Sequence, residues 1–169
     1  MEKKLKIGII GTGSISESHI HAYRKNPNVE VYAFCDIREE RLKEMGEKYG
    51  VTRLYTDKDI MLRELPELDA VSVCTWNSQH APCTIAALQA GKHVLCEKSL
   101  ASNHREAEEM FQLAYEKKLV LLEAMRTAFD PGMEVIKKSL NRIGEIRKAT
   151  FIYCQYSSRY DSFKEGKEH

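Results

Sequence analysis

A short apolar run that ends in a glycine turn constrains the fold of this chain more than any other feature. The run from Leu5 to Ile10 is almost wholly apolar, which is typical of a parallel strand buried on both faces. Gly11 and Gly13 follow at once, where the backbone must turn sharply and can come close to a ligand. A helix that begins at Ser14 directs its unpaired N–H groups and positive dipole end into this turn, so the expected guest is an anion, above all a pyrophosphate.

The second half of a dinucleotide-binding fingerprint follows on the next expected strand. Ser16 stands where the pattern G-x-G-x-x-G has its third glycine, and it is small enough for close packing of helix on strand. Asp36 closes the strand that starts at Val29, about 20 residues later, where a carboxylate can accept both hydroxyls of an adenine ribose. The turn by itself can be a backbone feature, and Asp36 can be a helix N-cap. Together they favour dinucleotide binding.

Strands and helices alternate along the chain. Apolar spacing and caps, among them Asn103 with Glu106 three residues later, define the elements. Helices are expected over residues 15–26, 39–49, 57–65, 82–90 and 103–117, and further strands over residues 53–55, 70–74, 93–96 and 120–122. This alternation predicts an α/β fold with a doubly wound parallel sheet and right-handed crossovers, which is the Rossmann fold.

Composition excludes several classes of partner. The chain has 169 residues, enough for one domain or one domain and the start of another. Its 26 basic and 25 acidic residues give a net charge of +1, which carries no footprint for nucleic acid or an anionic membrane. The apolar run breaks at Gly11, too early for a signal peptide or a membrane span. The five cysteines show no paired spacing, which favours reduced, buried thiols in a cytoplasmic protein.

Two polar segments fall where a doubly wound sheet binds its ligands, beyond the carboxyl ends of the strands. The segment Thr75–His80 follows one expected strand, and its side chains can contact ribose hydroxyls or a nicotinamide amide. Asn77 or Ser78 can equally cap the helix that follows. The pair Glu97 and Lys98 follows the next strand, where a lysine beside a carboxylate can polarise or protonate a substrate oxygen.

No metal site is expected. His19 and His21 are two residues apart on an expected helix, so their side chains cannot face one ion together. No cysteine has the spacing of a zinc ligand.

At this point the chain resembles the Gfo/Idh/MocA family of NAD(P)-dependent oxidoreductases. The motifs that carry the resemblance are Gly11-Thr12-Gly13 with His19 soon after, Cys35-Asp36-Ile37, Thr75-x-Asn77-x-x-His80 and the run from Ala90 to Lys98. The segment from Leu122 to Pro131 is similar to the family segment that enters the second domain, close to the dihydrodiol dehydrogenase branch.

The resemblance implies a cofactor, a reaction and a set of site residues. The cofactor is NAD, with NADP possible, and the substrate is a small molecule with a sugar, polyol or diol-type alcohol or carbonyl that exchanges hydride with the nicotinamide. Lys98, in the family's E-K-P motif, is the expected catalytic residue. Full-length family members are expected to form homo-oligomers. The implied cofactor contacts are Gly11, Thr12, Gly13, Ser14, Ile15, Asp36, Ile37, Arg38, Thr75, Trp76, Asn77, His80, Glu97, Lys98 and Arg126.

The chain departs from the family pattern at three positions. Ser99 occupies the place of the proline in E-K-P, so we expect a less rigid peptide there and no cis bond. Trp76 replaces the usual small residue or proline before Asn77. Ala128 stands where relatives near this branch commonly carry arginine, and Arg126 can partly substitute for it.

We predict a dinucleotide-binding domain over residues 1–123 and the incomplete start of an α+β substrate and oligomerisation domain over residues 124–169. In the second part a helix is expected from Asp130 to Leu140 and a first strand from Ala149 to Tyr156, before a charged end from Lys164 to His169. A non-catalytic NAD(P)-binding module is the alternative function. A methyltransferase also uses a glycine turn and an acidic ribose ligand, but it gives no reason for Glu97 and Lys98.

Overall fold

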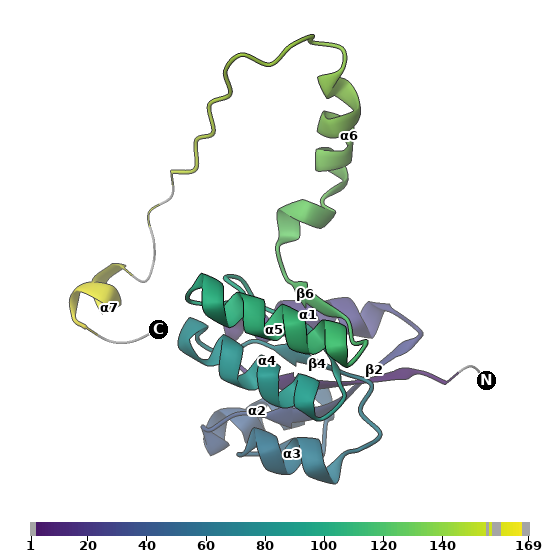
Figure 1. The fold of residues 1–169 in the computed structure, drawn as a ribbon. Helices are drawn as coiled ribbons and strands as arrows, with labels where there is room; N and C mark the ends of the chain where they lie inside the picture. The colour runs from purple at the N-terminus through teal and green to yellow at the C-terminus, as the bar shows by residue number, and fades with distance from the viewer. Residues whose placement is uncertain (1–2, 155, 157–159, 167–169) are drawn as a thin grey trace. The chain divides into compact units, whose positions relative to one another are not determined.

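The computed structural model describes residues 3–154, 156 and 160–166, and its contacts divide the chain into two units, residues 1–124 and 125–169. The first unit is a parallel sheet with helices on both faces (Figure 1). Its strands are β1 (Leu5–Ile10), β2 (Val29–Cys35), β3 (Leu54–Tyr55), β4 (Ala70–Val73), β5 (His93–Cys96) and β6 (Leu121–Glu123). Its helices are α1 (Ser14–Lys25), α2 (Glu39–Tyr49), α3 (Lys58–Glu64), α4 (His80–Gln89), α5 (His104–Glu116) and the 3-10 turn η1 (Asn77–Gln79).

The strand order is β3-β2-β1-β4-β5-β6, and every pairing is parallel. Strands β2 and β3 are added in turn on one side of β1, and β4, β5 and β6 are then added in turn on the other side. The carboxyl ends of the two strands at such a reversal, here β1 and β4, are the usual ligand site of doubly wound sheets. The predicted Rossmann fold is therefore confirmed.

Caps explain the small differences between predicted and observed element bounds. The helix predicted from Asp57 begins one residue later, because the Asp57 carboxylate accepts hydrogen bonds from the N–H groups of Asp59 (2.7 Å) and Ile60 (3.1 Å) and so is the N-cap of α3. Helix α4 begins at His80, two residues earlier than predicted. Pro82 is tolerated there because the first turn of a helix needs no backbone donor.

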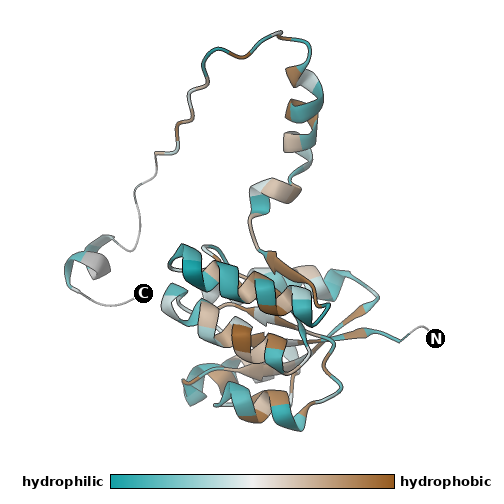
Figure 2. Ribbon diagram, viewed as in Figure 1, coloured by the Kyte–Doolittle hydropathy of each residue, from teal (hydrophilic) through white to brown (hydrophobic). Residues whose placement is uncertain are grey.

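The core lies in two layers, one on each face of the sheet. Ile20, Leu42 and Met45 of α1 and α2 pack with Phe34 of β2 on one face. On the other face the buried residues of α3, α4 and α5 pack against the alternate side chains of the same strands, including Met61, Leu88, Met110, Ala33 and Cys35. Figure 2 shows apolar colour on the strands and polar colour along outward faces such as that of α5. This two-sided burial accounts for the continuous apolar strands.

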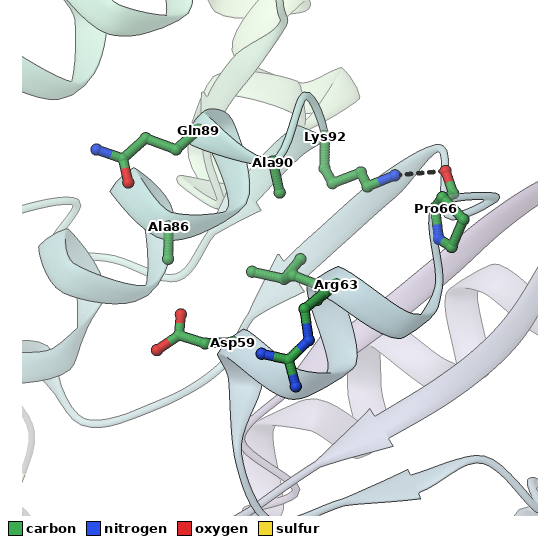
Figure 3. A pocket seen from close by; sticks show the side chains of 8 residues that line it. Asp59, Arg63, Pro66, Ala86, Gln89, Ala90 and Lys92 are labelled. Atoms are coloured by element: carbon green, nitrogen blue, oxygen red, sulfur yellow. Dashed lines mark hydrogen bonds between the residues drawn. The ribbon is translucent and has the colours of Figure 1, made fainter.

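A buried lysine joins the chain segments just before β4 and β5, at the amino ends of the strands. The ammonium of Lys92 donates a hydrogen bond to the carbonyl oxygen of Pro66 at 2.6 Å, as Figure 3 shows. Lys92 is only 5% exposed, and burial lowers its pKa. An open hollow of about 490 Å³ lies beside it, lined also by Asp59, Arg63 and Gln89.

Replacing Lys92 with methionine should destabilise the protein by about 1 kcal/mol, because the Pro66 carbonyl loses its charged donor while the aliphatic stem stays packed. Removing a buried charge offsets part of the loss. Urea unfolding measures the difference. Lys117→Met is the matched control, since Lys117 also donates to a carbonyl, that of Gln89 at 3.3 Å, but on the surface. A Lys92 variant as stable as the control would contradict the structural role of this bond.

The second unit contains the 3-10 turn η2 (Arg126–Phe129) and helices α6 (Pro131–Leu140) and α7 (Tyr160–Lys164). The Asp130 side chain caps α6 by accepting the N–H of Gly132 at 2.7 Å, as the predicted helix start requires. The predicted strand from Ala149 to Tyr156 is wrong for the residues described there, 149–154 and 156, which form no strand. A strand needs a pairing partner, and no strand lies elsewhere in the described part of this unit. Residues 155 and 167–169 lie outside the described residues.

Candidate cofactor-binding site

The glycine turn joins β1 to α1 through one position that admits only glycine. Gly11 has a φ of +90°, and a Cβ added there would lie 2.6 Å from the carbonyl oxygen of Cys74. The Gly11 N–H donates to the carbonyl of Cys35 at 2.8 Å, and the Cys74 N–H donates to that of Ile10 at 2.7 Å. The turn is thus held between the ends of β2 and β4, which forces a left-handed backbone.

Gly13 has a different reason to be glycine. Its φ of −68° suits any residue, and a Cβ built on it meets nothing within 4 Å. The open space lies at the N-terminus of the 12-residue helix α1, whose first N–H groups have no acceptor within the helix. Ser16 is fully buried and donates its hydroxyl to the Gly13 carbonyl at 2.7 Å, which supports the turn from below. The turn therefore fits a pyrophosphate in both space and charge.

Asp36 stands at the end of β2 and points back to the glycine turn. Its Oδ2 accepts hydrogen bonds from the N–H of Thr12 at 2.8 Å and the Thr12 hydroxyl at 2.9 Å. Its Oδ1 accepts the N–H of Arg38 at 2.9 Å and the Arg38 Nε at 3.1 Å. Burial alone raises the pKa of Asp36, but the bonds from Arg38 and Thr12 outweigh burial and leave the pKa below its ordinary value. The carboxylate is therefore ionised at neutral pH.

A second arginine closes the outer side of the turn. Arg41 donates from Nε to the Thr12 carbonyl at 2.9 Å and from Nη2 to Glu17 at 3.0 Å. Glu17 also accepts bonds from Lys48 (2.7 Å) and Tyr49 (3.0 Å). Bonds from Lys48, Tyr49 and Arg41 lower the pKa of Glu17 from 4.5 to about 2. This network ties α2 to the first turn of α1.

Glu17→Gln tests this network through its dependence on pH. Because folding lowers the pKa of Glu17 from 4.5 to about 2, its stabilising effect is present above pH 4.5 and is lost as the pH falls toward 2. The variant should be about 1 kcal/mol less stable than wild type at pH 7, and the difference should vanish near pH 2. Urea unfolding at several pH values measures it. Glu40→Gln, on the surface of α2, is the control and should match wild type at pH 7. A difference that stays constant with pH would contradict the ion-pair origin.

The segment after β4 forms the turn η1 and presents its side chains at the surface. Trp76, Asn77 and Ser78 are exposed. Neither Asn77 nor Ser78 caps α4, which begins after Gln79 without a side-chain cap, so that alternative is wrong. His80 is buried, and its ring lies between the carbonyl oxygens of Ser99 (2.7 Å from Nδ1) and Thr75 (3.1 Å from Nε2). His80 therefore connects the segment after β4 with the segment after β5 rather than facing solvent itself.

Three side chains, those of Glu97, Glu123 and His80, bind the backbone of the segment after β5. Glu97 is buried and accepts the Lys98 N–H on Oε2 at 3.1 Å, while the Leu100 N–H donates to Glu123 at 2.9 Å. The Lys98 side chain is exposed. The Lys98–Ser99 peptide bond is cis, so the expectation that serine removes a cis bond is wrong. That expectation considered proline chemistry alone, not the contacts of Glu97, His80 and Glu123 with this backbone.

Sequence reasoning missed a buried group below these segments. His19 of α1 lies 2.8 Å from Glu97 through Nε2 and 2.8 Å from the Ser72 hydroxyl through Nδ1, and Tyr23 donates to the same hydroxyl at 3.3 Å. One signal was available: Ser16, His19 and Tyr23 recur at helical spacing around the buried Ile20, which places them on the face of α1 toward the sheet.

The structure brings most of the predicted site residues to one edge. Asp36, the glycine turn, Thr75 and Glu97 follow β2, β1, β4 and β5, which are adjacent in the sheet. Ile37 is 80% exposed beside Asp36. Arg126 begins η2 and so belongs to the other unit.

Cysteines and histidines do not assemble further sites in the part of the chain that is described. Four cysteines are buried and free, and Cys154 is exposed. Burial raises the pKa of Cys35, Cys74 and Cys96 to about 12. No group of three or more metal-ligating side chains occurs among residues 3–154, 156 and 160–166. No helix in this same part has the length and apolar character to cross a membrane.

Comparisons with known proteins agree with this geometry. Residues 5–125 match the Gfo/Idh/MocA family described as "Oxidoreductase family, NAD-binding Rossmann fold". The chain is 36% identical over 165 residues to a scyllo-inositol 2-dehydrogenase (NADP(+)) of Bacillus subtilis, and this alignment covers 96% of this chain and 49% of that protein. It is 33% identical over 136 residues to a myo-inositol 2-dehydrogenase of Thermotoga maritima, which covers 80% of this chain and 40% of that protein.

The solved structure of a 3-ketoreductase from Actinomadura kijaniata with NADP superposes with a TM-score of 0.79 at 32% identity, over 86% of this chain and 47% of that one. The chain thus spans about half the length of the curated relatives it matches. The family match, over residues 5–125, covers nearly all of the first unit, including the glycine turn, Asp36, the Thr75–His80 segment and the Glu97–Lys98 pair. The chain therefore belongs to the Gfo/Idh/MocA family of oxidoreductases and carries its NAD-binding Rossmann domain.

Proposed function

We propose that this chain is the cofactor-binding part of an enzyme that transfers hydride between NAD(P) and the alcohol or carbonyl carbon of a sugar, polyol or diol. One observation carries the proposal: an anion-sized glycine turn, an ionised Asp36 and the Glu97–Lys98 pair follow β1, β2 and β5 of one parallel sheet, at the edge where doubly wound sheets bind dinucleotides. We propose that residues 1–123 form the cofactor domain and that residues 124–169 are the beginning of the substrate domain.

Each group has a proposed role. The turn from Gly11 to Ile15 binds the pyrophosphate, and Asp36 with Arg38 binds the adenine ribose. Thr75, Trp76 and Asn77 line the nicotinamide side. His80 and Glu97, whose polar atoms already bind the protein, position these segments instead of contacting the cofactor. Arg126 is a further proposed contact from the second unit.

Lys98 is the proposed catalytic residue. Its side chain is exposed at the carboxyl end of β5, where an ammonium can donate a proton or a hydrogen bond to the substrate oxygen. The nicotinamide supplies or accepts the hydride when it is bound. The protein aligns the two reactants and stabilises the charge that develops on oxygen.

Asp36 favours NAD over NADP, because its carboxylate accepts ribose hydroxyls and repels a phosphate at the same place. Arg38 opposes this preference, since its guanidinium already pairs with Asp36 and offers donors for a 2′-phosphate. The named relative from Bacillus subtilis uses NADP. We therefore propose NAD as the cofactor and NADP as an accepted second one.

The substrate class follows from the relatives. The inositol dehydrogenases named above oxidise polyols, as their names state, and a D-glucoside 3-dehydrogenase of Escherichia coli is 32% identical over 149 residues. We propose that the substrate is a small cyclic polyol or sugar. We also propose that the full-length enzyme is cytoplasmic and forms a homo-oligomer.

Trp76, the single tryptophan, provides the test. It is 50% exposed in the segment proposed to line the nicotinamide side. NADH should quench its emission and gain sensitised nicotinamide emission, with both signals saturating together at one site per chain. ADP-ribose, which lacks the nicotinamide, is the control ligand and should produce no sensitised emission. If calorimetry shows NADH binding while the Trp76 signal stays constant, the segment from Thr75 to His80 does not line the nicotinamide side.

A further inference from the structure

A line of buried and half-buried hydrogen bonds runs from α1 to the backbone of Lys98. Tyr23 donates to the Ser72 hydroxyl (3.3 Å), which lies 2.8 Å from His19 Nδ1. His19 Nε2 lies 2.8 Å from Glu97 Oε1, and Glu97 Oε2 accepts the Lys98 N–H at 3.1 Å. Ser72, His19 and Glu97 are all buried, at 0%, 9% and 8% exposed. Three elements, α1, β4 and β5, are therefore joined through side chains.

With Glu97 ionised and the imidazole neutral, one arrangement of hydrogens satisfies this line. An ionised Glu97 can only accept, so His19 Nε2 donates to it. His19 Nδ1 then accepts, which makes the Ser72 hydroxyl its donor. The Ser72 oxygen keeps its lone pairs for Tyr23 and for the Cys74 thiol, 3.8 Å away. Every donor has an acceptor, so the line fixes the Glu97 side chain in one orientation.

We propose that His19 is a positioning residue that acts through Glu97 to set the Lys98 backbone at the nicotinamide end of the cofactor. The inference rests on the proposed function. Among the residues that the structure describes, Glu97 is the only one whose side chain binds the Lys98 N–H, and His19 is its partner on the other oxygen. Without His19, the buried carboxylate of Glu97 loses the hydrogen-bond donor on Oε1. We expect the Glu97 side chain then to turn toward water.

The strand order limits which half of the cofactor such a change affects. The glycine turn and Asp36 follow β1 and β2, whereas Glu97 and Lys98 follow β5 on the other side of the reversal. A dinucleotide that crosses the reversal therefore has its adenine half over the first pair and its nicotinamide half over the second. His19 should consequently affect the binding of the nicotinamide half alone.

Calorimetry with two ligands tests this. NADH has both halves, and ADP-ribose lacks the nicotinamide. His19→Ala should weaken NADH binding roughly tenfold, the effect of losing one charge-assisted hydrogen bond, and change ADP-ribose binding less than about twofold. His21→Gln is the matched control on the same helix, because His21 is exposed and contacts Tyr49 rather than Glu97. It should change neither affinity.

A double-mutant cycle tests the route through Glu97. If His19 acts through Glu97, the double variant with Glu97→Ala should bind NADH no more weakly than Glu97→Ala alone. Losses that add in full, or a loss for ADP-ribose as large as that for NADH, would overturn the proposal and leave His19 a general support of the fold.

Amide hydrogen exchange separates this inference from the proposed function. His19→Ala should speed exchange at the Lys98 N–H about tenfold or more, while exchange in the core strands and in His21→Gln stays at the wild-type rate. If the wild-type protein binds neither NADH nor ADP-ribose, the proposed cofactor function fails. The exchange at Lys98 then decides the positioning role: faster exchange supports it, and unchanged exchange overturns it.

Discussion

Gly11→Ala should destabilise the protein by about 3 kcal/mol or more, the largest effect that we expect from a single methyl group in this chain. The residue has a φ of +90°, and the added Cβ would lie 2.6 Å from the oxygen and 2.7 Å from the carbon of the Cys74 carbonyl. These are backbone atoms at the end of β4, so they cannot turn aside as a side chain can. Urea unfolding measures the loss.

Gly13→Ala is the matched variant and should have the opposite profile. A Cβ at Gly13 meets nothing within 4 Å and the φ of −68° suits alanine, so stability should stay within about 0.5 kcal/mol of wild type. The methyl group would fill the space proposed for the pyrophosphate, and NADH affinity should fall on the order of 10- to 100-fold. Calorimetry measures it. Unchanged affinity would remove the pyrophosphate from this turn.

Asp36→Ala should have the second largest effect, because the carboxylate serves both the fold and the cofactor. Its loss leaves the buried Thr12 N–H without an acceptor, which should cost about 1 to 3 kcal/mol of stability. It also removes the ribose acceptor, which should weaken NADH binding on the order of 10- to 100-fold. Urea unfolding and NADH titration measure the two losses. NADH affinity equal to that of wild type would exclude Asp36 from the site.

The stability part of this effect should depend on pH. Because folding lowers the pKa of Asp36 below 3.8, its contribution is present above that pH and disappears as the pH falls through the folded value. The stability difference between wild type and Asp36→Asn should therefore shrink below about pH 4. Asp59→Asn is the control, since the Asp59 side chain is exposed and forms a surface ion pair with Lys58. It should stay within about 0.5 kcal/mol of wild type at pH 7.

Local patterns were enough to predict the fold class and to bring the candidate site residues to one edge of the sheet. The apolar run before Gly11 and the Asn103 cap act over a few residues, so they can be identified along the chain. Parallel strands separated by helices then require the carboxyl ends to share one edge. That requirement placed Asp36, Thr75 and Glu97 together before any distance was known.

The prediction of a strand from Ala149 to Tyr156 was wrong for the described residues, 149–154 and 156, because strand formation is not local. Its apolar and aromatic residues suit a sheet, but pairing needs a second strand, and the described part of this unit contains no strand. Phe151 and Ile152 are accordingly 94% and 81% exposed. The cis bond at Ser99 was missed for a related reason. The contacts of this backbone come from His80 and Glu123, which lie far from it in sequence.

The sequence by itself determined that this chain forms a Rossmann fold with a glycine turn and an acidic strand end, since both follow from hydrophobic periodicity and backbone sterics. The tertiary structure decided what the polar side chains do. It paired Asp36 with Thr12 and Arg38, enclosed His80 between two carbonyls, and joined His19 to Glu97 across 78 residues of sequence. The physical reason is that a buried polar group must find a partner, and only the folded chain, which brings α1 next to Ser72 and Glu97, determines which one lies within reach.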